Sequence, residues 1–425
     1  MVHHRYYRWY TIESIRFGNI MTKHYSPRTI EPIIDKASNA FKVIMVSGMR
    51  QVGKSTLLAH LAKQQRQYVT LDNSRQLLSA QESPETFFQL NPAPRTIDEI
   101  QLAPGLFRSL KEVVDQSDTP GQYWISGSQR LTLMANVTEA LPGRLVSFDL
   151  YPFSVYEREG KGLLQKPYLP GNLQSNLCPR SVSDCWKMIF QGAWPGVIDK
   201  DAEVRDWFFE SLVSLYLSKD VAALAQVDKT IQFRKFLKAL AIRTGQELRL
   251  QPLAEAAGVQ TATIKRWLSI AEASGLIILL PPFFSNVDKQ LVKSPKVYMT
   301  DTGLVAHLLG IQTPEEMKQH ANQGNFFETF VVMEIVKSWA HNGKKADFYF
   351  YRDNRGMEID LLIHSEGKYY PVEIKSKVVA DSHDAKWLVA FHSLSVPTGK
   401  ATIICQTDIP YYVTKDVLAH NIWSI

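Results

Sequence analysis

The chain has 425 residues, of which 45% are hydrophobic and 21% are charged, and its formal net charge is +6. This length is too great for one ordinary hydrophobic core, so we expect a globular protein of two or three domains. The longest apolar run, residues 276–284, has the length of a strand and contains Pro281 and Pro282, which excludes a membrane-spanning helix there and predicts no membrane partner.

Two further features concern the setting of the protein. The cysteines, Cys178, Cys185 and Cys405, are odd in number and lack a metal-ligand spacing, which is typical of free thiols in a reducing cytosol and predicts a cytoplasmic location. Residues 1–21 are basic and aromatic and lack the apolar centre of a signal peptide. We interpret them as a flexible arm, or as sequence upstream of a true start at Met21.

The strongest motif lies in the N-terminal third. An apolar run at 41–47 predicts a buried strand, and helix formers follow at 57–65. Between them lies a phosphate-binding loop (P-loop) that consists of Gly48, Met49, Arg50, Gln51, Val52, Gly53, Lys54, Ser55 and Thr56. Its glycines let backbone N–H groups point at phosphate oxygens, its lysine reaches the β- and γ-phosphates, and its serine ligates magnesium. The loop therefore predicts ATP and Mg²⁺ as cofactors.

Three later segments complete a predicted ATPase site. Residues 96–101 resemble a Walker B segment, in which Asp98 holds the magnesium ion and Glu99 activates the attacking water. The preceding residues are poorer in apolar side chains than a central strand should be. The strand predicted at 123–127 leads to Ser128 and Gln129, and we expect one of the two to contact the γ-phosphate. Arg144 is expected to stabilise transition-state charge, in its own chain or in a neighbouring subunit of a homo-oligomer; a surface ion pair is the alternative.

These motifs, together with Gly192–Gly196, Lys296–Tyr298, Asp301–Leu304 and Val372–Lys375, resemble the prokaryotic AAA-type ATPases that carry a C-terminal domain of unknown function. The resemblance covers nearly everything after Met21. It implies ATPase roles for Lys54, Ser55, Asp98, Glu99 and Arg144.

The middle of the chain predicts a winged-helix domain. Helices are expected at 231–244, 250–257 and 261–274, followed by a strand at 276–280, which is the helix-turn-helix order. In the last helix Ile264, Trp267, Leu268 and Ala271 form one apolar stripe. Thr263, Lys265 and Arg266 lie outside it and are the candidate DNA contacts. Residues 228–300 carry eleven Lys and Arg against five Asp and Glu, which favours a polyanion there; a lid or protein-docking module remains the alternative.

The C-terminal third resembles the PD-(D/E)XK nuclease core, with Ile359 in place of the proline. Asp360 and Glu373 are expected on adjacent strands, where they would share a second magnesium ion, and Lys375 would align the nucleophile. Glu328, or secondarily Glu334, would add a carboxylate from a helix. The alternative is an ion pair in a fold without activity.

The predicted fold class is α/β. We expect an arm at 1–21, an AAA-type P-loop domain at 22–155, a Pro- and Gly-rich linker at 156–204, a helical winged-helix domain at 205–290 and a restriction-endonuclease-like domain at 291–425. Three functions stay open. The first is an Mg²⁺-dependent ATPase that acts on or near DNA, the second is a nucleotide switch for a protein partner, and the third is an ATP-licensed nuclease.

Overall fold

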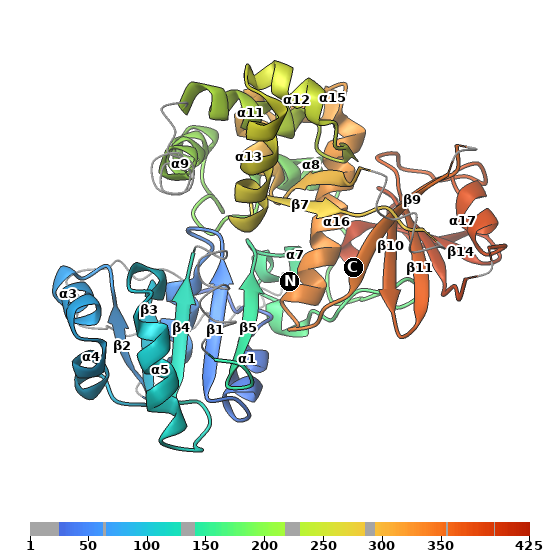
Figure 1. Ribbon diagram of the computed structural model, residues 1–425. Helices are drawn as coiled ribbons and strands as arrows, with labels where there is room; N and C mark the ends of the chain where they lie inside the picture. Colours follow the sequence, from blue (N-terminus) through green and yellow to red (C-terminus); the bar gives the residue numbers. More distant parts are fainter. Residues whose placement is uncertain are drawn as a thin grey trace, which may run out of the picture.

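The computed structural model describes residues 25–62, 65–128, 141–216, 230–284, 294–353, 356–394 and 396–425. The arm expected at 1–21 and Gln129 lie outside these residues. Figure 1 shows three parts: an N-terminal α/β part in blue and teal, a mainly helical part in green and yellow above it, and a C-terminal part in orange and red beside both. Within the described residues, no helix is long and apolar enough to cross a membrane.

The N-terminal part is built on a parallel sheet. Its strands are β1 (Val43–Gly48), β2 (Gln67–Thr70), β3 (Arg95–Asp98), β4 (Tyr123–Gly127) and β5 (Leu145–Leu150), in the order β2-β3-β4-β1-β5. Alternate residues of β1 face opposite sides of the sheet: Ile44 and Val46 join one core cluster, and Val43 and Met45 join another. Both faces are therefore buried, as parallel sheets require.

Helices cover the two faces of this sheet. They are α1 (Glu31–Ser38), α2 (Lys54–Ala62), α3 (Ser74–Glu82), α4 (Pro84–Leu90) and α5 (Leu106–Asp115). Leu57 and Leu58 of α2 pack in the cluster that contains Ile44, and Leu110 of α5 packs in the cluster that contains Val43. The carboxyl ends of β1 and β4 point toward the middle part (Figure 1).

The prediction of a linker at 156–204 is wrong. This segment contains α8 (Val182–Gln191), and α7 (Val155–Arg158) begins one residue before it. Glu157 is fully buried between Arg28 Nε at 3.0 Å and His341 Nδ1 at 3.2 Å, and the Tyr168 hydroxyl lies 2.7 Å from His420 Nε2. The prolines and glycines mark an irregular backbone, but this backbone is packed between the N-terminal and C-terminal parts.

The middle part is mainly helical. Its elements are α9 (Ala202–Leu215), α11 (Thr230–Ile242), β6 (Gln246–Glu247), α12 (Leu250–Ala257), α13 (Thr261–Ala273), β7 (Ile277–Leu280), β8 (Lys296–Met299), α14 (Thr302–Leu309) and α15 (Pro314–Gln319). The strands form an antiparallel sheet in the order β6-β8-β7. The boundary predicted between 290 and 291 is therefore wrong, because β8 is the pairing partner of β7 and β6.

The C-terminal part begins with the long buried helix α16 (Gln323–Ala340), which lies between the other elements (Figure 1). Its other elements are β9 (Asp347–Arg352), β10 (Glu358–Ser365), β11 (Lys368–Ile374), α17 (Lys386–Phe391), β12 (Ala401–Ile404), β13 (Tyr411–Thr414) and β14 (Val417–His420). The sheet order is β13-β14-β12-β11-β10-β9. β9, β10 and β11 pair antiparallel, and β11 pairs with β12 in parallel.

One hydrophobic cluster extends through all three parts. It includes Met49 from the P-loop, Trp267 and Tyr298 from the middle part, and Phe330 and Trp423 from the C-terminal part. The three parts therefore share a continuous apolar core, so a displacement of one part changes the packing of the others.

Candidate functional site

The P-loop has the geometry that its sequence predicts. β1 ends at Gly48 and α2 begins at Lys54. Gly48 has a positive φ of 154°, and a Cβ there would lie 2.2 Å from the carbonyl oxygen of Leu150. Only glycine fits this position, because any side chain would collide with the backbone of Leu150 at the end of β5.

The Lys54 side chain folds back over the P-loop. Its exposed fraction is 4%, and its Nζ donates to the carbonyl oxygens of Gly48 at 3.0 Å and Met49 at 2.8 Å. The ammonium group thus lies above the loop at the amino terminus of α2, where the backbone N–H groups of a helix have no partners within the helix. These groups together fit a polyphosphate.

Asp98 ends the neighbouring strand β3 and is also buried. Ser126, on β4, donates from Oγ to Asp98 Oδ1, and Tyr68, on β2, donates from its hydroxyl to Asp98 Oδ2 at 2.5 Å. Burial and the negative charge of Asp98 raise the pKa of the Tyr68 phenol. Sequence reasoning missed Tyr68, which stands 30 residues before its partner.

Glu99 and Ser128, which the sequence predicted at one site, lie together. Ser128 Oγ is 3.4 Å from Glu99 Oε2, and Gln101 Nε2 contacts both the Glu99 carboxylate and Ser128 Oγ, the latter at 3.2 Å. Glu99 has a left-handed backbone with φ 57° and ψ 41°. Such strain in a residue other than glycine is concentrated at functional sites. Gln101 belonged to the predicted Walker B segment, although no role was assigned to it.

Arg144 does not reach this site within its own chain. Its backbone precedes β5 and accepts from Val43 N, at the amino-terminal end of the sheet. The P-loop follows the other end of β1, which is about 17 Å away over five residues at roughly 3.3 Å each. Arg144 instead pairs with Asp115 through Nε and through Nη2 at 3.0 Å. The catalytic role predicted for it in its own chain is therefore wrong, and the alternative of a surface ion pair is what the structure has.

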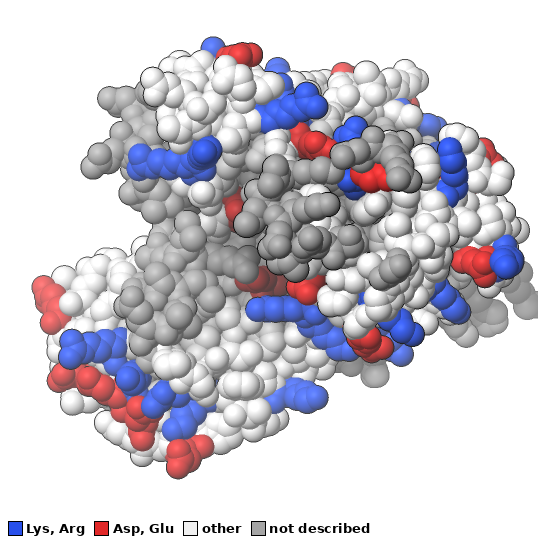
Figure 2. All heavy atoms as spheres, turned by 45° about the vertical axis from the view of Figure 1, so that its right-hand side comes forward, with Lys and Arg blue, Asp and Glu red and all other residues white. Residues whose placement is uncertain are grey.

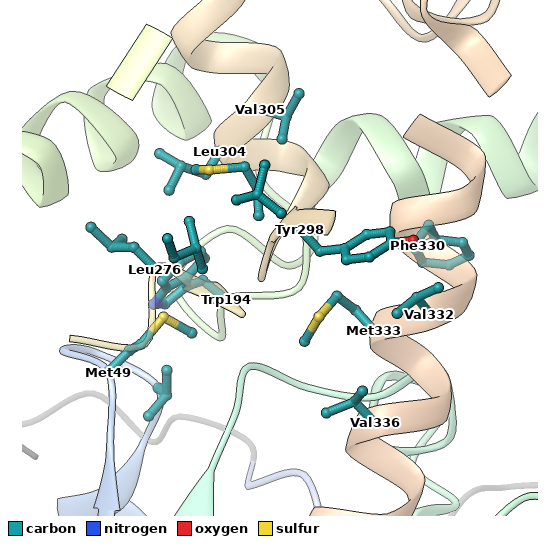
Figure 3. Packing of buried hydrophobic residues seen from close by; sticks show 14 of the residues in the cluster. Met49, Trp194, Leu276, Tyr298, Leu304, Val305, Phe330, Val332, Met333 and Val336 are labelled. Atoms are coloured by element: carbon teal, nitrogen blue, oxygen red, sulfur yellow. The ribbon is translucent and has the colours of Figure 1, made fainter. Parts of the chain in front are cut away.

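The segment 156–204 and the middle part pack directly on the P-loop (Figure 3). Trp194 donates from Nε1 to the Arg50 carbonyl at 3.0 Å, and the Thr300 hydroxyl lies 3.5 Å from Met49 Sδ. A Cβ on Gly275 would lie only 2.7 Å from Met49 Cγ. The loop that is predicted to hold the nucleotide is therefore in close contact with residues far along the chain.

The C-terminal carboxylates gather as predicted. Asp360, on β10, accepts from Ile374 N at 2.9 Å, and Lys375 Nζ lies 2.5 Å from Glu373 Oε1. Glu328, on α16, faces the same cluster, and its pKa rises to about 7 because it is buried and close to Asp360. Burial, followed by the charge of Asp360, also raises the pKa of Glu373. We call Glu328, Asp360 and Glu373 the acidic cluster.

Glu334, the secondary candidate, does not belong to the acidic cluster. Its carboxylate binds Lys337 Nζ at 2.8 Å and Val155 N at 2.7 Å. The contact with Val155 N joins α16 to the amino terminus of α7, and Lys337 is a neighbour of Glu334 on α16 itself, so Glu334 has a structural role.

A lysine from the middle part enters the acidic cluster, which the sequence did not predict. Lys296 Nζ lies 3.0 Å from Glu358 Oε1, 3.2 Å from Glu328 Oε1 and 3.6 Å from Asp360 Oδ1. The Tyr298 hydroxyl donates to the same Glu328 oxygen at 2.6 Å. In the part of the chain that the structure describes, no group of three or more Asp, Glu, His or Cys side chains could hold a metal ion. The second magnesium ion at Asp360 and Glu373 stays a prediction.

The apolar stripe predicted on α13 is confirmed, because Ile264, Trp267, Leu268 and Ala271 are all buried. Lys265 and Arg266 are exposed and Thr263 is half-buried. On the face drawn in Figure 2, basic and acidic side chains are interspersed and form no single basic patch.

Comparisons with known proteins agree with the geometry of the first site. Residues 40–159 match a family model described as an AAA domain. The N-terminal part is therefore an AAA-type P-loop ATPase domain. Residues 182–315 and 323–425 match two domains of unknown function, DUF8612 and DUF4143, so the predicted resemblance to ATPases with such a C-terminal domain is confirmed. Neither match describes a winged helix or a nuclease.

Relatives extend this likeness over most of the chain. Two uncharacterized proteins, from Mycobacterium bovis and Mycobacterium tuberculosis, are each 28% identical over 342 residues, which cover 80% of this chain and 71% of theirs. Among solved structures, a Walker-type ATPase of Pyrococcus abyssi has a TM-score of 0.41 at 10% identity and covers 65% of this chain and 94% of its own.

Proposed function

We propose that the protein is a magnesium-dependent ATP hydrolase that acts on or near DNA. The proposal of a hydrolase rests on one observation: Lys54, Asp98 and Glu99 lie together at the carboxyl edge of one parallel sheet. Ligands of open α/β sheets bind at this edge, where the loops after adjacent strands converge. The AAA domain match of residues 40–159 supports the same function.

The groups of the P-loop bind and orient the triphosphate. Backbone N–H groups of residues 48–53 and the amino terminus of α2 hold the phosphate oxygens. Lys54 exchanges its two carbonyl acceptors for the β- and γ-phosphates, which are stronger acceptors because they are charged. Ser55 and Asp98 hold the magnesium ion, which neutralises the charge that develops on the phosphates.

Glu99 is the general base of the proposed reaction. Its carboxylate accepts a proton from the water that attacks the γ-phosphate. Gln101 contacts both Glu99 and Ser128, so the base and the hydroxyl next to the γ-phosphate are held in one arrangement.

Release of phosphate from ATP by the purified chain tests the hydrolase. We expect saturable turnover that requires Mg²⁺ and disappears in EDTA. A folded protein that neither binds nor hydrolyses nucleotide with a divalent ion present would contradict the proposal.

The middle part supports the DNA component. A helix, a short strand, two further helices and a hairpin follow one another in the order α11, β6, α12, α13, β7 and β8, and this order is that of winged-helix DNA-binding modules. The exposed Lys265 and Arg266 on α13 supply positive charge where the second helix of such a pair meets the major groove.

Stimulation of ATP turnover by duplex DNA tests this component. We expect stimulation at low salt that weakens steeply between 50 and 200 mM salt, because phosphate contacts compete with counterions. The variant Lys265→Ala/Arg266→Ala should lose the stimulation and keep the basal rate, whereas Lys235→Ala/Lys238→Ala, which changes the same charge on α11, is the matched control. Turnover indifferent to DNA at every salt concentration would contradict it.

A specific observation also favours the second candidate function, a nucleotide switch for a protein partner in which the C-terminal part is inactive. β8 carries Lys296 in the acidic cluster at one end and is followed by Thr300 at the P-loop. The Lys296 ammonium contacts the carboxylates that a nuclease would use for magnesium. Under this function, nucleotide changes the docking of the C-terminal part and no cleavage occurs.

One assay distinguishes the third candidate function, an ATP-licensed nuclease, from the other two. Cutting of DNA that needs Asp360 and Lys375 and depends on ATP would support it. Its absence in wild-type protein with Mg²⁺ or Mn²⁺ would leave the switch and the DNA-stimulated ATPase.

A further inference from the structure

The carboxylate of Asp98 is held by two hydroxyl donors, one for each oxygen. Ser126 Oγ donates to Oδ1, and the Tyr68 hydroxyl donates to Oδ2 at 2.5 Å. Asp98 is 4% exposed and Ser126 is fully buried, so water has little access to replace either donor. The orientation of this carboxylate therefore depends on the two hydroxyl groups.

Tyr68 also faces the P-loop. The Ser55 side chain lowers the pKa of the phenol and partly offsets the rise that burial and Asp98 cause, so it lies near the Tyr68 hydroxyl. Tyr68 thus binds Asp98 and lies near Ser55, the two side chains to which the proposed function assigns the magnesium ion. It reaches them from β2, which is an edge strand of the sheet.

We propose that Tyr68 is a positioning residue that orients Asp98, and through it the magnesium ion, for ATP hydrolysis. This inference rests on the proposed function. Tyr68 touches neither the phosphates nor the attacking water in this role, and its contribution passes through the carboxylate that it holds.

The chemistry of a carboxylate explains how this works. An ionised carboxylate has about four acceptor positions, so the two hydroxyl donors leave about two for the water ligands of a magnesium ion. A donor on each oxygen also fixes the plane of the group. Magnesium requires nearly ideal octahedral geometry and tolerates a misoriented partner poorly. Loss of the Tyr68 hydroxyl frees the carboxylate to rotate. It therefore weakens the binding of the magnesium ion before it weakens the binding of the nucleotide.

The test is the magnesium dependence of Tyr68→Phe, which removes one hydroxyl and keeps the ring. ATP turnover is measured over a range of buffered free Mg²⁺, and the affinity for a fluorescent ATP analogue is measured separately in EDTA. Tyr123→Phe is the matched control. Tyr123 is a buried tyrosine of β4 in the same sheet whose hydroxyl donates to the Asn91 carbonyl at 3.2 Å, away from the site.

We expect the free Mg²⁺ concentration at half-maximal turnover to rise about tenfold in Tyr68→Phe, which corresponds to the loss of one hydrogen bond to a charged group. Metal-free ATP binding should stay within about twofold of wild type, and Tyr123→Phe should keep the wild-type magnesium curve. A Tyr68→Phe protein with an unchanged magnesium midpoint, whatever its maximal rate or thermal stability, would overturn the inference.

This result is distinct from a failure of the proposed function. If the wild type hydrolyses no ATP, the function itself is wrong. If the wild type is active and the two Phe variants show the same magnesium midpoint, only the role of Tyr68 is wrong.

Discussion

Lys296 Nζ lies 3.2 Å from Oε1 of Glu328, and both side chains are buried although they belong to different parts of the chain. Lys296 begins β8 of the middle part and Glu328 lies on α16 of the C-terminal part. The other end of β8 leads to Thr300, which contacts Met49 of the P-loop. A strand only about 13 Å long, at roughly 3.3 Å per residue, therefore connects the P-loop with the acidic cluster.

The first prediction concerns this buried ion pair. Lys296→Met should lower the free energy of unfolding by about 3–5 kcal/mol, because it leaves buried carboxylates without their cation. The measurement is urea unfolding followed by tryptophan fluorescence.

Glu247→Gln is the matched control for Lys296→Met. It removes the exposed ion pair between Arg352 Nη1 and Glu247 Oε1, which lie 2.9 Å apart and also join the middle and C-terminal parts. An exposed pair contributes about 1 kcal/mol or less. Equal losses of stability in the two variants would show that Lys296 is not a buried counter-ion.

The second prediction is a pH dependence of stability. The pKa of Glu328 is raised from 4.5 to about 7 by burial and by Asp360, so the folded state binds this proton more tightly than the unfolded state does. The contribution of Glu328 is therefore fully present below about pH 4.5 and is lost as the pH rises to about 7.

Subtraction of the curve of Glu328→Gln from that of wild type isolates this contribution. The subtraction is needed because buried His341 and His420 have lowered pKa values and act in the opposite direction, stabilising the fold as the pH rises. We expect the difference in unfolding free energy to decline from pH 4.5 to 7. A flat difference would mean that the Glu328 carboxyl titrates as it does in water.

The contrast between the two sites shows what sequence can predict. The P-loop, β1 and α2 are local: one continuous segment specifies strand, glycine loop and helix, so their geometry follows from residues 43–62. Glu99 and Ser128 were also predictable, because carboxyl ends of parallel strands meet at one edge.

Contacts between distant segments were not predictable in the same way. The pairing of Lys296 with Glu328, and of Tyr68 with Asp98, depends on how segments about 30 residues apart pack, and no local pattern encodes it. The prediction of a linker at 156–204 is wrong because a high content of Pro and Gly indicates an irregular backbone and does not indicate whether that backbone is buried. Arg144 was misplaced because its position after a helical stretch did not reveal at which end of the sheet it lies.

The third prediction concerns Arg144. Arg144→Ala should leave ATP turnover within about twofold of wild type, because Arg144 pairs with Asp115 at the end of the sheet opposite the P-loop. The contrary outcome is a loss of turnover in Arg144→Ala, relative to wild type, that becomes larger as the protein concentration is raised. It would indicate that Arg144 acts on the nucleotide of a neighbouring subunit.

The fourth prediction concerns nucleotide binding. Lys54→Ala should raise the Kd for ATP at least ~100-fold, because it removes two charge-assisted contacts to phosphate oxygens worth about 1.5–3 kcal/mol each. Lys42→Ala is the control, because Lys42 precedes the same strand β1 at its opposite end and pairs with Asp118 at 3.0 Å. Binding of a fluorescent ATP analogue measures both variants. Retention of wild-type affinity in Lys54→Ala would remove this lysine from the phosphate site.

The last prediction separates binding from chemistry at Glu99. Glu99→Gln keeps the size of the side chain and the contacts with Gln101 and Ser128, but an amide cannot accept the proton of the attacking water. ATP affinity should therefore stay within about threefold of wild type while kcat falls at least tenfold, toward the roughly 10²–10⁴-fold that a general base contributes. Glu112→Gln, on the exposed face of α5, controls for the loss of one charge in the same domain. Single-turnover and steady-state phosphate release measure the effect, and equal kcat values in wild type and Glu99→Gln would assign the activation of water to another group.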